Sequence, residues 1–270
     1  MKPKNTLTFL ITVFSLFVIL ACTASFTAEF PTATSPAPTE TATVPPLPPT
    51  PTPANPPPFV ISALGFNETG PNSEYTITAQ IPAILENTDP RASKFNEEMQ
   101  TLVQNEIAGF KKAVAEIPHD PASATNFLDV KYGLLFQNDH IVSIKIEFSA
   151  YTGGAHPYGY SAPVNYDFSQ GRNLSLDELF LPNSNYLELI ASYCIAELSK
   201  QPFFEGPFQE GAQPTAENYH KWNIANTGLV ITFDEYKVAP YAAGPQVMVV
   251  PYSGLQAVIK PQGPVAGITP

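Results

Sequence analysis

A proline-rich tract divides the chain and limits which part of it can fold. Between residues 31 and 58, 12 of the 28 residues are proline, seven are threonine, and Glu40 is the one charged residue. The tract has no apolar periodicity, so it cannot bury a hydrophobic core. Proline-rich chain prefers an extended conformation that rises about 3.1 Å per residue. We therefore expect a tether here, followed by about 200 residues that can fold around a core.

The residues before this tract have the order of a bacterial export signal that ends at a cysteine. Lys2 and Lys4 precede an uncharged, mostly apolar run over residues 6–21, which is short for a membrane-spanning helix. The run ends in Val-Ile-Leu-Ala and is followed by Cys22, which resembles the lipobox of bacterial lipoproteins. We therefore expect a lipoprotein signal peptide over residues 1–21 and covalent acyl chains on Cys22.

These expectations place the folded part on the extracytoplasmic face of a bacterial cell membrane. Two or more acyl chains on Cys22 anchor a protein stably in the lipid bilayer, at about 0.8 kcal/mol for each buried methylene. Residues 23–58 of the tether could hold the folded part up to roughly 100 Å from that bilayer. An ordinary export signal with a chance cysteine, or an uncleaved anchor, is the alternative interpretation.

Charge and cysteine content exclude some partners. The chain has 24 acidic and 13 basic residues, for a net charge of −11. Such a surface repels phosphate backbones, so we expect no nucleic-acid partner. It would attract a cationic partner, although acidic surfaces also occur where no partner exists. With Cys22 lipidated, Cys194 has no cysteine to pair with, and its apolar surroundings favour a core position.

The folded part has the pattern of an α+β protein, with antiparallel sheets and packed helices. Alternating apolar residues predict strands, whereas apolar residues at spacings of three and four predict two helices, at 90–117 and 186–200. The expected strands are 60–66, 75–81, 125–137, 141–151, 160–168, 228–233 and 246–250. A loop-rich stretch fills 201–227, and a short closing helix is expected at 252–259.

The first candidate ligand-binding segment, residues 151–157, follows the predicted strand that ends at residue 151. Gly153 and Gly154 permit unusual backbone angles or a close backbone approach. Thr152 and His156 flank them, and His156 could titrate or bind a partner. The structural alternative is that the glycines only shape a loop in which His156 bonds a backbone carbonyl.

The second candidate segment, residues 239–245, contains two prolines and a glycine. Pro240 and Tyr241 are its candidate ligand-binding residues. A stiff loop that presents an aromatic ring suits protein recognition, because little conformational freedom is lost on binding. The same features suit a tight corner whose tyrosine covers the core.

These two segments, together with Tyr-Asp-Phe at 166–168 and Leu-Ser-Leu-Asp-Glu-Leu-Phe at 174–180, resemble a bacterial extracytoplasmic family. The family is typified by the outer, lysozyme-binding domain of the RsiV anti-sigma factor and by the accessory domain of PdaC-type deacetylases. The resemblance implies two joined lobes, a smaller α/β lobe at 59–120 and a larger one at 121–264. It also implies a ligand- or protein-binding module, since a sigma-binding segment and a separate catalytic domain are not found in this sequence.

Motifs for catalysis are not found in the sequence. It has no Gly-x-Ser-x-Gly elbow, no His-Glu-x-x-His helix, no paired zinc cysteines and no phosphate loop. We therefore expect no catalytic residue, no cofactor and no metal, although His156 could assemble with Glu147 or Asp167 in space. Three hypotheses follow: a module that binds a lysozyme-like hydrolase or a wall component, an envelope-accessory protein without a discrete ligand, and a wall-polymer hydrolase.

Overall fold

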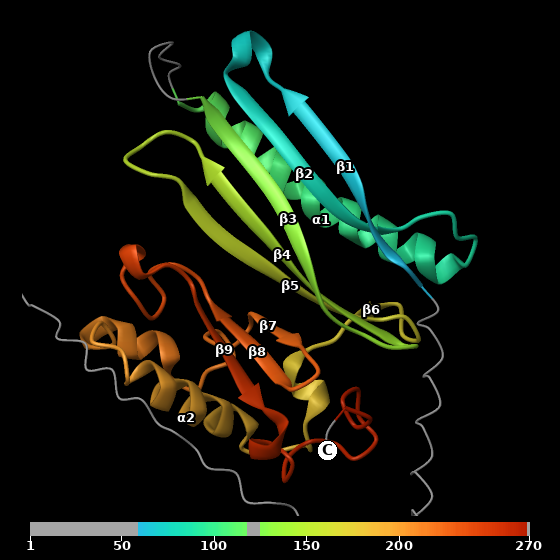
Figure 1. The fold of residues 1–270 in the computed structure, drawn as a ribbon, viewed down its shortest axis with the longest axis vertical. Helices are drawn as coiled ribbons and strands as arrows, with labels where there is room; N and C mark the ends of the chain where they lie inside the picture. The colour runs from blue at the N-terminus through green and yellow to red at the C-terminus, as the bar shows by residue number, and fades with distance from the viewer. Residues whose placement is uncertain (1–58, 118–124, 269–270) are drawn as a thin grey trace, which may run out of the picture. The chain divides into compact units, whose positions relative to one another are not determined.

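Two β-sheets form the framework of the folded part. The computed structural model describes residues 59–117 and 125–268. The signal peptide, the lipidation site at Cys22 and the tether lie outside the described residues. Strands β1–β6 form a six-stranded sheet in sequential order, and β7–β9 form a three-stranded sheet (Figure 1). The α+β class predicted from the sequence is confirmed.

The six-stranded sheet is antiparallel except at one position. Its strands are β1 (Ile61–Thr69), β2 (Tyr75–Ile84), β3 (Asn126–Gln137), β4 (Ile141–Tyr151), β5 (Tyr158–Asp167) and β6 (Arg172–Asn173). The pair β2–β3 is parallel, because α1 lies between these strands in the chain and returns it to the same end of the sheet. β6 pairs only with the end of β5, so the part of β5 before Asn165 forms an edge of the sheet.

Helix α1 (Pro90–Ala115) covers one face of this sheet. The carboxylate of Asp89 caps its first turn by accepting a hydrogen bond from the Arg91 backbone N–H at 2.8 Å, and Pro90 fits the first helical position. The residues that α1 buries recur every three or four positions: Ala92, Phe95, Met99, Val103, Ile107, Phe110 and Val114. This spacing forms a single apolar stripe against the sheet, as the sequence predicted.

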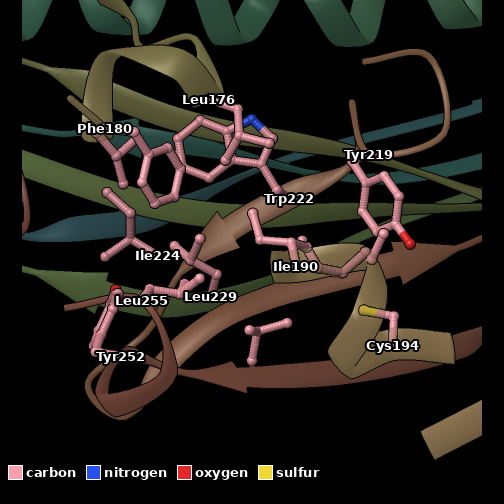
Figure 2. Close-up of a cluster of buried hydrophobic side chains, with 14 of the residues drawn as sticks. Leu176, Phe180, Ile190, Cys194, Tyr219, Trp222, Ile224, Leu229, Tyr252 and Leu255 are labelled. Atoms are coloured by element: carbon pink, nitrogen blue, oxygen red, sulfur yellow. The ribbon is translucent and has the colours of Figure 1, made fainter. Parts of the chain in front are cut away.

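The three-stranded sheet and α2 (Tyr186–Leu198) enclose a second core. Its strands are β7 (Trp222–Ile224), β8 (Gly228–Phe233) and β9 (Gln246–Pro251). Figure 2 shows side chains from α2, these strands and the neighbouring loops that share this core, among them Cys194, Trp222 and Tyr219. Cys194 is fully buried, which confirms it as a core residue, and burial raises the pKa of its thiol to about 12.

A buried polar network joins the two sheets. The side-chain oxygen of Asn165 on β5 accepts hydrogen bonds from the Ser143 hydroxyl at 2.7 Å and the Ile224 N–H at 3.0 Å. Its amide donates to the Trp222 carbonyl at 2.8 Å, while Asn223 donates to the Ile144 carbonyl at 2.9 Å. The three side chains that make these bonds are nearly inaccessible to solvent, so β7 is held to the large sheet by polar groups that all have partners.

Several boundaries differ from the sequence-based expectation. The lobe boundary expected near residue 120 falls inside the six-stranded sheet, since β2 and β3 lie on either side of it and are hydrogen-bonded. The two apolar cores divide near residue 170 instead, except that Phe136 of β3 and Ile141 of β4 belong to the second core. β7 lies within the stretch expected to be loop, and the expected closing helix is only a short 3-10 turn, Tyr252–Gly254.

Short 3-10 helices complete the described elements. They are η1 (Pro71–Ser73), η2 (Leu176–Leu179), η3 (Gly206–Ala212), η4 (Tyr241–Ala243) and η5 (Tyr252–Gly254). Among the helices that the structure describes, none has the length and apolar character needed to span a membrane.

Candidate ligand-binding site

The first candidate segment is the loop from β4 to β5. Gly153 and Gly154 have φ angles of 91° and 102°, which side chains other than glycine rarely adopt. The Tyr151 hydroxyl donates to the Gly154 carbonyl at 3.0 Å and holds the turn in shape. The glycines therefore have the conformational role that the sequence suggested, and they place His156 on the exposed side of the loop.

The second candidate segment follows β8 and is anchored by its own buried residues. Val238 and Ala239 are buried, so the chain is fixed just before Pro240 and the 3-10 turn η4. Gly244 ends that turn with a φ of 66°, which again favours glycine. Tyr241 is the first residue of η4 and is left half-exposed.

The two segments meet although more than 80 residues separate them in the chain. The rings of His156 and Tyr241 stack with centroids 3.9 Å apart and planes 24° apart. The Tyr241 hydroxyl donates to the Pro157 carbonyl at 2.7 Å, which joins the segments directly. Figure 1 shows both segments on the same side of the view, at the ends of β4, β5 and β8. The structure thus brings the candidate residues of both segments together, and their role in binding stays a prediction.

A third ring, Tyr236, extends this stack. Its centroid lies 5.7 Å from that of Tyr241, and its hydroxyl lies 3.5 Å from Nε2 of His156. The ring is 59% exposed. We call His156, Tyr236 and Tyr241 the aromatic cluster. An exposed group of three rings held by hydrogen bonds between loops is suited to contact a ligand, because its shape exists before the ligand arrives.

The backbone of Tyr236 is unusual. The Lys237 N–H donates to the Asp234 carbonyl at 3.1 Å, so residues 234–237 form a β-turn with Tyr236 at its third position. Tyr236 has a φ of 65°, as the third residue of a type II turn requires, and glycine is the usual residue there. A bulky residue in this region is strained, and such strain concentrates at functional sites. Tyr236 could not be predicted from the sequence, because nothing local marks a tyrosine with a positive φ.

A pocket of about 270 Å³ opens beside this turn. It is lined by Asn218, His220, Lys221 and the run of residues 232–237. The Lys221 ammonium forms an ion pair with Asp234, whose carboxylate also accepts from the Ser161 hydroxyl at 3.2 Å. Glu235 accepts a hydrogen bond from the Gly159 N–H on the edge of β5 at 3.3 Å. These bonds fix one wall of the pocket to the large sheet.

Tyr160 on β5 contacts both the pocket residue Lys221 and helix α1. Its hydroxyl donates to the Glu106 carboxylate at 2.7 Å, and the Lys221 ammonium lies 6.0 Å from the centre of its ring. Burial and, second, the hydrogen bond to Glu106 raise the pKa of Tyr160 well above its usual value. The residue therefore stays protonated and has a structural role at neutral pH.

The structure does not assemble the catalytic pairs considered for His156. Glu147 forms an ion pair with Lys145 at 2.9 Å. Asp167 lies at the opposite end of β5, where it accepts hydrogen bonds from the backbone of Ser169 and Gln170. Ten residues of strand span roughly 30 Å, so Asp167 cannot reach His156. The contacts of His156 are the Pro157 carbonyl and the two tyrosines.

Comparison with known proteins agrees with the fold. The family described as deacetylase PdaC matches residues 68–158, and the family described as protein of unknown function (DUF3298) matches residues 177–253. A DUF3298 family protein from Pseudomonas aeruginosa PAO1 has a similar structure, with a TM-score of 0.57 at 16% identity. That similarity covers 79% of this chain and 97% of the other.

Two curated relatives share part of the sequence. Peptidoglycan-N-acetylmuramic acid deacetylase PdaC of Bacillus subtilis (strain 168) is 27% identical over 172 residues, or 63% of this chain and 37% of PdaC. Esterase Rv3036c of Mycobacterium tuberculosis (strain ATCC 25618 / H37Rv) is 25% identical over 113 residues, or 42% of this chain and 50% of that protein. The chain thus matches no more than half the length of either relative.

The fold and the two matched regions define an extracytoplasmic-type accessory module. The two family matches, the relative PdaC and the DUF3298 structural neighbour support the family resemblance that the sequence motifs predicted. His156 lies near the end of the PdaC-type match, whereas Tyr236 and Tyr241 lie within the DUF3298 match. The aromatic cluster is therefore built by both regions.

Proposed function

We propose that this protein is a lipid-anchored module of the bacterial envelope that binds a wall ligand through the aromatic cluster. The observation that carries the proposal is the meeting of two distant loops in an exposed stack of three rings. Aromatic side chains give large contact areas at low conformational cost, and they dominate many recognition sites.

The construction of the cluster favours binding over a purely structural role. A structural tyrosine is normally buried, as Tyr219 is in the second core, with its hydroxyl bonded to the Ala212 carbonyl at 2.7 Å. Tyr236 instead exposes most of its ring. An envelope protein without a ligand would gain little from a strained turn that holds this ring in an exposed stack.

The anchor and the tether complete this proposal. Acyl chains on Cys22 would hold the protein in the cell membrane, and residues 23–58 would let the binding module reach the wall. Metabolic labelling of the full chain with a fatty acid tests this part. Cys22→Ala should abolish the label, and a label that persists in that variant would refute lipidation at this residue.

Co-sedimentation with purified peptidoglycan tests the binding proposal. The test uses residues 53–270, which form one compact unit. Tyr241→Ala should reduce the bound fraction at least tenfold, because it removes the central ring of the stack and its bond to Pro157. Leu134→Ala, at an exposed apolar residue of β3, is the control and should bind as the parent does. Equal binding by all three proteins would refute the site.

A lysozyme-like hydrolase is a second candidate ligand, favoured by the net charge of −11. An acidic surface attracts such a cationic protein, and this attraction weakens as salt is added. Calorimetry with lysozyme at two salt concentrations separates specific capture from simple charge attraction. Specific capture should survive high salt and be lost in Tyr241→Ala. Binding that disappears with salt and ignores the substitution would leave no site-specific capture.

A further inference from the structure

We infer that the pocket beside Tyr236 is a subsite for one neutral sugar residue of a wall glycan. This inference rests on the proposed function and names the ligand chemistry at the same site. Its basis is an unpaired buried hydroxyl, a balanced set of charges and an exposed ring on a strained turn, all within the residues that line one pocket.

The unpaired hydroxyl belongs to Thr232. The residue lines the pocket and is 4% exposed, and its Oγ1 has no hydrogen-bond partner among the described residues. A buried hydroxyl without a partner costs about 1–3 kcal/mol, so such groups are rare unless a ligand or a water molecule completes them. A sugar hydroxyl is a suitable partner, because it can both donate and accept.

The charges of the pocket favour a neutral ligand. The lining residues include two lysines, Lys221 and Lys237, and two acids, Asp234 and Glu235, so these four charges cancel. Lys221 and Asp234 already form an ion pair, and Glu235 already accepts from the backbone of β5. A ligand with a strong charge of either sign would meet a like charge in this wall. Hydroxyl and acetamido groups can bond to both kinds of side chain without that repulsion.

The ring of Tyr236 supplies an apolar surface beside these polar groups. The flat face of a sugar ring carries C–H groups that can pack on an aromatic face, while its edge carries the hydroxyls. The pocket volume of about 270 Å³ lies just below the range of about 300–1,000 Å³ for small-molecule sites, which suits one sugar ring better than a long segment. The neighbouring rings of Tyr241 and His156 continue the surface for the next residues of the glycan.

Two substitutions separate binding from folding. Thr232→Val keeps the shape and removes the unpaired hydroxyl, so the thermal midpoint should stay level or rise. Tyr236→Gly removes the ring and relieves the positive φ, so its midpoint should also stay level or rise. Each should weaken binding of the acetylated tetramer of N-acetylglucosamine roughly tenfold in calorimetry, since each removes one contact group. A residue with a purely structural role would not show this combination.

Calorimetry with the tetramer can support or overturn the sugar subsite. Salt-independent binding of the tetramer that both substitutions weaken supports the subsite, with Leu134→Ala again as the control. Binding that Thr232→Val leaves unchanged would mean that only water meets this hydroxyl, and it would overturn the inference. A tetramer that does not bind overturns it too. If peptidoglycan or lysozyme is then still captured through Tyr241, the proposed function stands without the sugar subsite, and if neither is captured, both fail.

Discussion

The two regions of the molecule are built in different ways. The first region, residues 59–173, packs one long helix on a sheet of long strands, and its core residues lie in these elements apart from Phe59 and Phe168. The second region, residues 174–268, surrounds three short strands and one helix with loops and 3-10 turns. Many of its core residues, such as Tyr219, Val238 and Val265, lie outside any strand or α-helix.

The two regions are therefore stabilised by different kinds of contact. In the first region, local periodicity and strand pairing define the core. In the second, the loops are fixed by contacts with residues distant in sequence, including the network around Asn165 that joins β7 to the large sheet. The aromatic cluster lies where a loop of the second region meets the start of β5. Its geometry should therefore depend on the correct folding of both regions.

Removing a fully buried ring from the first core should have the largest effect. Phe95 is fully buried, and its ring lies 5.2 Å from Tyr166 and 5.6 Å from Phe168. Phe95→Ala should lower the free energy of unfolding by about 3–5 kcal/mol, through lost burial and a cavity. Urea denaturation followed by circular dichroism measures the loss, and Gln100→Ala, exposed on the same helix, should change stability little.

The same experiment tests whether the second region folds independently of the first. Trp222 is the only tryptophan in the chain and lies in the second core, so its fluorescence reports on the second region. If the second region depends on the first, Phe95→Ala shifts the fluorescence transition together with the circular dichroism transition. A fluorescence transition that stays in place would show that the second region folds independently.

Cutting the network between the sheets should have the next largest effect. Asn165→Ala removes the acceptor for Ile224 and the donor to Trp222, and no water can readily enter this buried site. The expected loss is about 1–3 kcal/mol. The Trp222 fluorescence transition should move to lower urea than the circular dichroism transition. Asn67→Ala, at an exposed position of β1, is the matched control.

Helices and strands could be predicted from the sequence where their residues form a local pattern. The bounds predicted for 141–151 and 228–233 coincide with β4 and β8, and the apolar stripe over 90–117 became α1. Elements that are held in place by residues distant in sequence could not be predicted in this way. β7 has only three residues and is held by pairing with β8 and by Asn165, so no periodicity could reveal it. The parallel pair β2–β3, which places the expected lobe boundary inside one sheet, depends likewise on a crossover.

The candidate site divides in the same way. Residue type alone identified the glycines at 153 and 154 and the rigid segment around Pro240. Glycine permits unusual backbone angles and proline fixes φ, so both residue types mark such conformations in the sequence. Tyr236, Thr232 and their pocket could not, because a positive φ at a tyrosine and an unpaired buried hydroxyl exist only in the folded chain.

Acid should act on one contact at the border of the two regions. The Arg172 guanidinium, 2.6 Å from Glu178, lowers the pKa of that carboxyl to about 2, and the N–H of Ser175 contributes at 2.7 Å. Because the folded pKa lies below the unfolded value of 4.5, this stabilisation is complete above that value and is lost as pH falls toward 2. Solvent screening of the exposed arginine keeps this contribution small.

Glu178→Gln tests that contact through the pH dependence of stability. The variant should be less stable than the parent at neutral pH, and the difference should shrink as pH falls from 4.5 toward 2. Urea denaturation of the parent and the variant at several pH values measures this difference and its change with pH. A difference that stays constant across this range would show that the carboxylate charge contributes nothing.

The smallest effect on stability should come from single hydroxyls in the two candidate segments. The Tyr151 hydroxyl joins the first segment to itself at Gly154, whereas the Tyr241 hydroxyl joins the second segment to Pro157 of the first. Each bond is exposed, so Tyr151→Phe and Tyr241→Phe should each cost about 0.5 kcal/mol or less. Hydrogen exchange should nevertheless differ, because Tyr241→Phe should speed exchange in both segments and Tyr151→Phe only in 152–157. Equal exchange in the two variants would mean that ring stacking alone holds the segments together, and Tyr241→Phe should then keep its full affinity for the wall ligand.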